Sequence, residues 1–128
     1  REAGDAVLRG LGRVLQRHVR EEDLLCRFQG EEFLILASCS SEEALGVAQR
    51  LAAHIRRFPL VPDREDLRVT VSIGVAAYPE HGASPRDLFE AAEVALKTAQ
   101  ARGRNMCVKY EPSLRSTRPA ARPIRSTY

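Results

Sequence analysis

The sequence lacks any pair of cysteines at the spacing of a metal site or a redox motif. It has three cysteines, and all are far apart: Cys26, Cys39 and Cys107. An odd number at wide spacing is typical of reduced thiols in a cytosolic compartment. The three histidines also lack the spacing of a ligand set, so we expect surface or capping roles for them.

The sequence also lacks a long apolar run. No stretch approaches the roughly 20 apolar residues that a membrane-spanning helix needs, and no signal peptide is visible. We therefore expect a cytoplasmic domain, either free or as the cytoplasmic part of a larger, membrane-attached protein. The hydrophobic share of 44% and the charged share of 29% are ordinary for a globular protein, and 128 residues suffice for one domain with a core.

The body of the chain carries no excess charge. The net charge is +3, and residues 111–128 account for all of it with four arginines and one glutamate. A nucleic-acid-binding face needs clustered positive charge, so we expect no nucleic-acid partner. The same segment holds three prolines among Ser, Thr and Arg. We predict a single domain over residues 1–110 and a disordered basic tail over 111–128.

The most informative part of the sequence is a short polar turn between two apolar runs. Apolar, strand-favouring residues on both sides of Gln29-Gly30 predict a β-hairpin with a tight turn. Glu31 and Glu32 follow at once, and because neighbouring strand residues point to opposite faces, one of them can serve a site. Gly30 would let a phosphate approach its backbone, and a metal ion bridging a carboxylate to phosphate would explain the acidic pair. A charged hairpin tip is the alternative.

Hydrophobic spacing predicts the remaining elements. Helical periodicity covers residues 4–19. A capping box begins a helix over about 40–57, and Ser-Pro-Arg-Asp begins another over about 84–103, which ends at a glycine. Strict alternation predicts a strand over 67–77, to which we assign packing and no chemistry. Residues 106–110 would form a final edge strand.

The hairpin resembles the signature of the GGDEF family, the diguanylate cyclases, whose turn reads Gly-Gly-Asp/Glu-Glu-Phe. Here the turn reads Gln29-Gly30-Glu31-Glu32-Phe33. Gly4-Asp5-Ala6-Val7-Leu8 matches the family's Gly-Asp-x-x-Leu, residues 69–75 match its central strand, and residues 95–105 resemble its Ala-Leu-Tyr-x-Ala-Lys-x-x-Gly-Arg-Asn. The resemblance covers about residues 1–110. It implies an α/β fold in which helices flank a mostly antiparallel central sheet, similar to nucleotide cyclase and polymerase palm domains.

The resemblance also implies an enzyme of bacterial second-messenger signalling. Members of the family condense two GTP molecules into cyclic di-GMP and release pyrophosphate. The reaction uses Mg²⁺ or Mn²⁺, and each protomer of a transient homodimer holds one GTP. An upstream sensory or regulatory domain is the expected partner.

The resemblance assigns roles to five residues. Glu31 would be a metal ligand and Glu32 a second catalytic carboxylate, while Gly30 would bind the substrate phosphates through its backbone. Arg104 would contact the triphosphate, and the Asp5 carboxylate would accept hydrogen bonds from the N–H groups of guanine. Spacing alone favours a capping role for Asp5 at the start of the predicted helix, and the resemblance shifts the interpretation to guanine binding.

A predicted inhibitory site precedes the hairpin. The family's product-inhibition motif is Arg-x-x-Asp at this offset, and Arg20 and Asp23 match it. An arginine can donate to guanine O6 and N7, and an aspartate can accept from its N1 and N2. Arg50 stands where family members often carry a second arginine for the inhibitory dinucleotide. A solvated charged turn and an exposed helical arginine are the alternatives.

The chain departs from the family pattern in three places. Gln29 replaces the first glycine of the signature, and Gln100 replaces the phosphate-contacting lysine, for which Lys97 lies one turn earlier. The family domain also begins with a βα segment ahead of Arg1, which supplies a metal-ligand Asp. Without that segment we expect a weak Mg²⁺ site, a gap in the sheet and little product. The alternative functions are a catalytically impaired module that binds cyclic di-GMP or GTP, and a structural dimerisation domain.

Overall fold

The fold is a four-stranded sheet between helices. The computed structural model describes residues 10, 13, 23–29, 31–59, 61, 63–64 and 69–117. Within the predicted helix over 4–19 only Gly10 and Arg13 belong to this part of the chain, and both are helical. The elements follow in the order β1 (Leu24–Gln29), β2 (Glu32–Ala37), α2 (Ser41–Arg57), β3 (Ser72–Ala77), α3 (Pro85–Ala101), β4 (Cys107–Lys109) and α4 (Ser113–Thr117).

The strands lie side by side in chain order, β1-β2-β3-β4. The predicted hairpin is confirmed, since β1 and β2 pair antiparallel. The prediction of a mostly antiparallel sheet is wrong for the described strands, because β2–β3 and β3–β4 are both parallel. In each case a helix carries the chain back to the edge where the previous strand began. The expected gap is also absent from these four strands, since β2 pairs directly with β3 from Glu32–Ser72 to Ala37–Ala77.

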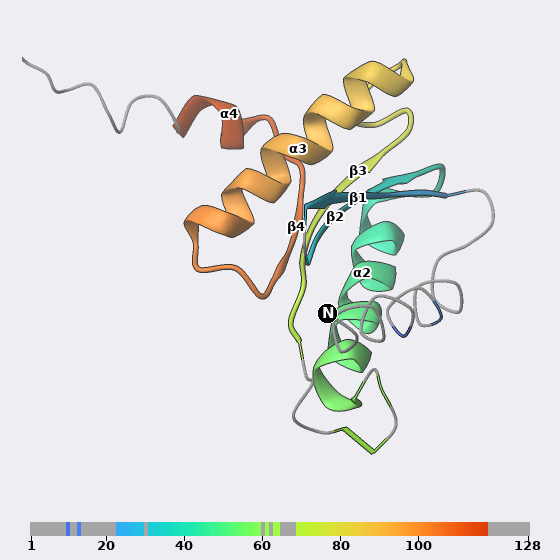
Figure 1. The fold of residues 1–128 in the computed structure, drawn as a ribbon. Coiled ribbons are helices and arrows are strands. Elements are labelled where there is room, and N and C mark those ends of the chain that lie inside the picture. Colours follow the sequence, from blue (N-terminus) through green and yellow to red (C-terminus); the bar gives the residue numbers. More distant parts are fainter. Residues whose placement is uncertain are drawn as a thin grey trace, which may run out of the picture.

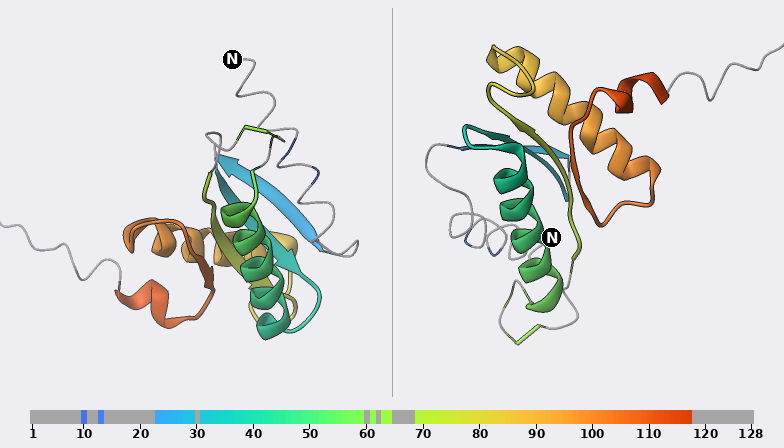
Figure 2. Two further views of the ribbon diagram at one scale, coloured as in Figure 1. Left: turned by 90° about the horizontal axis from the view of Figure 1, so that it is seen from below. Right: turned by 180° about the vertical axis from the view of Figure 1, so that it is seen from behind.

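The two long helices cover opposite faces of the sheet (Figures 1 and 2). Side chains alternate between faces along a strand, and β2 uses both. Phe33 and Ile35 pack in the core under α2, whereas Leu34 and Leu36 pack under α3. The sheet is therefore a central layer with an apolar core on each side.

Strand β3 is buried along its whole length. Ile73 and Val75 belong to the core under α2, and Ala76 belongs to the core under α3. Gly74 is in close contact with α3, since a Cβ atom there would lie 2.2 Å from the carbonyl oxygen of Ala92. The alternation predicted for this strand is present, but the positions between its large residues are small and buried.

Both predicted helix starts are confirmed. The Ser40 hydroxyl accepts from the Glu43 N–H at 3.1 Å, and the Ser84 hydroxyl accepts from the Asp87 N–H at 3.1 Å. Helix α3 ends just before Gly103, whose φ of 114° is readily adopted only by glycine. No helix in the described part of the chain is long and apolar enough to span a membrane.

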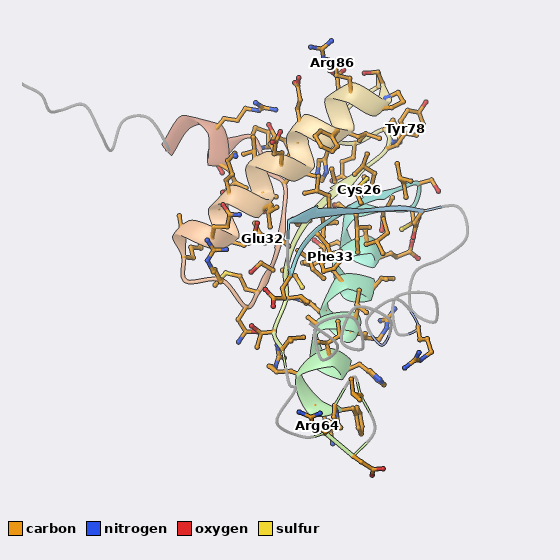
Figure 3. The ribbon with its side chains drawn as sticks, viewed as in Figure 1. Cys26, Glu32, Phe33, Arg64, Tyr78 and Arg86 are labelled. Carbon is orange, nitrogen blue, oxygen red and sulfur yellow. The ribbon has the colours of Figure 1, made fainter. Side chains whose placement is uncertain are left out.

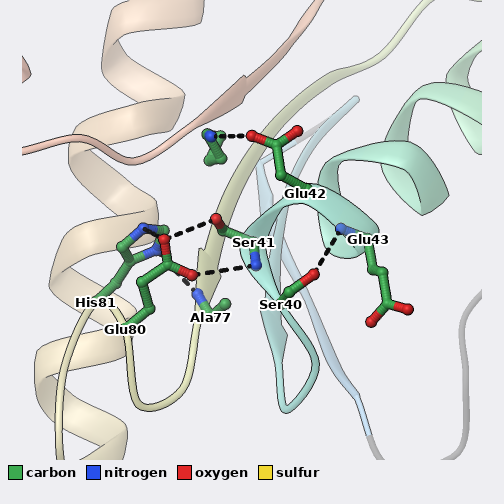
Figure 4. Close-up of polar contacts among 8 residues, drawn as sticks. Ser40, Ser41, Glu42, Glu43, Ala77, Glu80 and His81 are labelled. Atoms are coloured by element: carbon green, nitrogen blue, oxygen red, sulfur yellow. Dashed lines mark hydrogen bonds and ion pairs between the residues drawn. The ribbon is translucent and has the colours of Figure 1, made fainter.

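Hydrogen bonds hold the start of α2 against the turn that follows β3 (Figure 4). The backbone N–H and the hydroxyl of Ser41 donate to the Glu80 carboxylate at 3.3 and 2.9 Å. These two hydrogen bonds, with the hydroxyl bond the stronger, lower the pKa of Glu80. The ring of His81 accepts the Ala77 N–H through Nδ1 at 3.0 Å, and burial lowers the pKa of His81.

The predicted tail is partly folded. Residues 113–117 form helix α4, and Leu114 packs against the core under α3. Arg115 donates through Nε to the hydroxyl of Tyr110 at 2.8 Å, and its guanidinium lies 5.3 Å from the ring centroid. The prediction of disorder is therefore wrong for 113–117. Residues 118–128 lie outside the described part of the chain.

Candidate functional site

The two segments of the predicted active site lie together at one edge of the sheet. Strands β2, β3 and β4 are parallel, so all three begin at the same edge. Glu31 and Glu32 lie at the start of β2, Ser72 lies at the start of β3, and Arg104 and Asn105 lead into β4. The hairpin turn and the Gly-Arg-Asn segment are 72 residues apart in sequence and meet here.

Glu32 and Arg104 form an ion pair at this edge. Arg104 donates through Nη1 to the Oε2 atom of Glu32. The carboxylate side chain is only 12% exposed, whereas the arginine side chain is 59% exposed. Glu32 and Phe33 are labelled in Figure 3, and as neighbours on β2 they serve opposite faces of the sheet. The guanidinium therefore remains open to a ligand from solvent while its partner is fixed in the strand.

Glu31 is the exposed carboxylate of the pair and lies in the turn before β2. Its carbonyl oxygen accepts the Ser72 N–H at 3.1 Å. Among the described residues no three His, Cys, Asp or Glu side chains form a metal-binding cluster. Mg²⁺ commonly takes one or two carboxylates together with substrate phosphates. Glu31, the exposed carboxylate, is therefore a candidate ligand for a metal ion that substrate phosphates also bind.

The loop that carries Arg104 has an unusual backbone. Arg104 and Asn105 have φ values of 68° and 54°, and Gly103 before them also has a positive φ. Two contacts hold Asn105: its N–H donates to the Ser72 hydroxyl at 3.0 Å, and its carbonyl Oδ1 accepts from Arg56 Nη1 at 3.3 Å. Neither Ser72 nor Arg56 is among the residues predicted from the sequence. The only signal for Ser72 is a hydroxyl in an apolar strand.

The last turn of α3 carries no basic residue. Gln100 is half-buried there, and Lys97 is exposed one turn earlier. In this segment Arg104 is the cation that the structure shows paired with the acidic turn, through Glu32.

The predicted inhibitory residues lie elsewhere. Asp23 accepts the Ser38 N–H through Oδ1 at 3.3 Å, just before β1 begins. Since β2 has six residues and a strand rises roughly 3.3 Å per residue, this edge is about 20 Å from Glu31. Arg50 is exposed on α2. Asp5, Arg20 and Gly30 lie outside the described residues.

An apolar hollow of about 450 Å³ opens beside Asp23. Leu24 and Tyr78 line it and are about half exposed, and Ser38 joins it to Asp23. A tyrosine ring and a leucine side chain near a carboxylate suit a planar base that carries N–H donors.

The chain is similar to known signalling proteins. Residues 1–106 match the family described as diguanylate cyclase, GGDEF domain. The response regulator PleD of Caulobacter vibrioides is 39% identical over 110 residues, which cover 84% of this chain and 24% of PleD. Diguanylate cyclase A of Treponema denticola is 33% identical over 104 residues, which cover 80% of this chain and 28% of that protein.

A solved structure agrees with these relatives. The truncated form of Pseudomonas aeruginosa TpbB that comprises only the GGDEF domain matches with a TM-score of 0.70 at 31% identity, over 90% of this chain and 68% of that one. The chain spans about a quarter of the length of the curated relatives it matches. Its family match, its sequence identity and its sheet agree, and the chain belongs to the GGDEF diguanylate cyclase domain family.

Proposed function

We propose that this chain is the cyclase-type domain of a cytoplasmic signalling protein and condenses two GTP molecules into cyclic di-GMP. The ion pair between Glu32 and Arg104 carries the proposal, because it joins the acidic turn to the cationic loop at one edge of the sheet. A carboxylate group for a metal and a guanidinium for phosphate are the two functions that a bound nucleoside triphosphate requires.

Each proposed residue has a distinct task toward GTP. Arg104 binds triphosphate oxygens, for which a guanidinium provides two parallel donors. Asp5 accepts from the N–H groups of guanine, and Gly30 lets a phosphate approach the backbone of the turn. Glu32 orients Arg104 through their ion pair before the substrate arrives.

The reaction needs two protomers and a divalent cation. In the proposed step the 3′-hydroxyl oxygen of each GTP forms a bond to the α-phosphorus of the other. The bond between that phosphorus and the oxygen that bridges it to the β-phosphate breaks, the hydroxyl proton passes to solvent, and pyrophosphate leaves. Alignment of the two substrates supplies much of the acceleration. Glu31 would hold Mg²⁺ or Mn²⁺, which would neutralise the charge that develops on the phosphates. A regulatory domain outside this chain would control how the protomers meet.

Product analysis tests the proposal. The purified protein is incubated with GTP and Mg²⁺, and cyclic di-GMP and pyrophosphate are quantified. With the family's βα segment placed ahead of residue 1, we expect both products, and we expect none when Glu31→Ala is introduced, because that variant lacks an oxygen ligand that no neighbour replaces. Glu90→Ala is the matched control, because Glu90 is an exposed carboxylate on α3. Product formation by Glu31→Ala at the rate of the parent protein would show that the metal assignment is wrong.

Binding without turnover is the second candidate function. Gln29 and Gln100 stand where the family has a glycine and a lysine, and the last turn of α3 consequently has no cation. These substitutions favour a domain that binds cyclic di-GMP or GTP and acts on a partner domain. Binding of either nucleotide in the absence of any product would select this function.

A further inference from the structure

We infer that Ser72 is a positioning residue for nucleotide binding, because its side chain fixes the loop that presents Arg104. This inference rests on the proposed function, since it assigns Ser72 a role in the same GTP site. Ser72 lies at the start of β3 and is 4% exposed. It touches both halves of the site at once, one through its backbone and the other through its hydroxyl.

The backbone contact joins Ser72 to the acidic turn. Its N–H donates to the carbonyl oxygen of Glu31 at 3.1 Å, and its Cα pairs with that of Glu32 in the parallel ladder. Any residue other than proline can make this contact, because it uses only the backbone. The position of β3 against the turn therefore does not depend on the hydroxyl.

The hydroxyl contact is specific to the side chain. Ser72 Oγ accepts the N–H of Asn105 at 3.0 Å. Arg104 and Asn105 both have positive φ values, which L-amino acids other than glycine adopt reluctantly. Two such residues in succession persist only where their surroundings hold them. The Ser72 hydroxyl is a buried acceptor at the point where the loop leaves this conformation and enters β4.

The Arg104 side chain depends on that backbone. The Arg104 N–H donates to the carbonyl oxygen of Ala99 at 2.8 Å, so one end of the loop is fixed to α3. Ser72 fixes the other end through Asn105, and Arg104 lies between the two contacts. Without the hydroxyl, the left-handed conformation loses one of its two contacts at Asn105, and the guanidinium is no longer held over Glu32.

A double-mutant cycle tests the inference. Binding of 3′-deoxy-GTP with Mg²⁺ is measured by calorimetry, because this analogue lacks the hydroxyl that reacts. We expect Ser72→Ala to weaken binding by about three- to tenfold, the loss that one buried hydrogen bond produces. In an Arg104→Ala background the same change should alter binding by less than about twofold, because the residue that Ser72 positions is gone.

Ser84→Ala is the matched control. It also removes a serine hydroxyl that accepts a backbone N–H, but at the other end of α3, about 25 Å from the site at 1.5 Å per residue. We expect unchanged binding in Ser84→Ala. Amide exchange of the Asn105 N–H should become faster in Ser72→Ala and stay unchanged in Ser84→Ala. Should Ser72→Ala fail to fold, Ser72→Cys replaces it with a weak acceptor of similar size.

The outcomes separate the inference from the proposed function. If the parent protein does not bind the analogue, the proposed function is overturned, and the role of Ser72 falls with it. If the parent binds and Ser72→Ala binds equally well, the inference alone is overturned. It is also overturned if Ser72→Ala weakens binding equally with and without Arg104, because the effect is then a general loss of structure.

Discussion

Arg104 donates to the carboxylate of Glu32 although 72 residues separate the two in sequence. Glu32 is held in a strand, whereas Arg104 sits on a loop between two fixed contacts. The group proposed to bind phosphate is therefore oriented by contacts within the protein. A triphosphate that bound here would draw the guanidinium from one set of oxygens to another, without ordering a free side chain.

The first prediction concerns Arg104. We expect Arg104→Ala to weaken binding of 3′-deoxy-GTP by about tenfold or more, because a charge-assisted hydrogen bond is worth roughly 1.5–3 kcal/mol. The free energy of unfolding should change by less than about 1 kcal/mol, because the arginine is mostly exposed. Arg86→Ala, at the other end of α3 and also in an exposed ion pair, should change neither quantity. Calorimetry and urea denaturation measure the two effects, and unaltered binding in Arg104→Ala would refute the phosphate role.

The second prediction concerns the opposite edge of the sheet. We expect cyclic di-GMP to bind the protein and Arg20→Ala to weaken that binding by about tenfold, which corresponds to about 1.4 kcal/mol. The guanidinium would donate to a guanine whose other edge meets Asp23, beside the apolar hollow that Leu24 and Tyr78 line. Arg13→Ala is the control, because Arg13 is an exposed helical arginine. If neither the parent nor Arg20→Ala binds in a calorimetric titration, the Arg-x-x-Asp segment is only a solvated turn.

The third prediction compares two glycine-to-alanine substitutions. In Gly74→Ala the new Cβ would lie 2.2 Å from the Ala92 carbonyl oxygen and 2.6 Å from the Leu96 nitrogen. Because both are helix backbone atoms, α3 must move away from the sheet. We expect the free energy of unfolding to fall by roughly 3 kcal/mol or more, the upper end for overpacking. Gly46→Ala meets only the end of the Arg50 side chain, at 3.5 Å, and should stabilise helix α2 by about 0.5–1 kcal/mol. Urea denaturation of both variants tests the opposite signs.

The fourth prediction concerns pH. Burial lowers the pKa of His81 below its ordinary value of 6.5, and Nδ1 already accepts the Ala77 N–H, so a proton there breaks a hydrogen bond. Below pH 6.5 the unfolded chain therefore binds more protons than the folded one, and stability falls as the pH falls. Glu80, whose pKa is lowered mainly by the Ser41 hydroxyl, adds a loss in the same direction below about its ordinary 4.5.

Melting temperatures between pH 5 and pH 8 measure this dependence. In His81→Gln the decline between pH 7 and pH 5 should be smaller than in the parent protein, because the neutral amide does not titrate. An identical pH profile in parent and His81→Gln would exclude His81 as its source.

Local signals made much of the fold predictable. The hairpin follows from two apolar runs around a tight turn, and the starts of α2 and α3 follow from Ser40 and Ser84, which accept N–H groups three residues later. The two ends of the candidate site were predictable only through family resemblance. Their contact was not, because nothing in either segment specifies a partner 72 residues away.

The arrangement of the sheet could not be predicted in the same way. When two successive β-α-β connections are both right-handed and each adds its new strand on the same side, their helices lie on the same face of the sheet. Helices α2 and α3 lie on opposite faces of strands in the order β2-β3-β4, so their crossovers have opposite hands. Because Ser72, Gly74 and Ala76 are small, a second helix can pack on this face of β3. Large polar side chains at these positions would have indicated a face that is exposed to solvent. Helix α4 was missed because its anchors are single residues, Leu114 and Arg115, in a proline-containing segment.

Burial of β3 on both faces also governs the order in which the chain assembles. During synthesis the hairpin can close as soon as its two strands emerge, because its partners are adjacent in sequence. The two cores form later, because α2, α3, β2 and β4 all pack on β3. Strand β3 emerges about forty residues after β2. The second face of that strand stays uncovered until α3 follows. Folding on the ribosome therefore passes through a stage in which the strand that links both cores has only half of its partners.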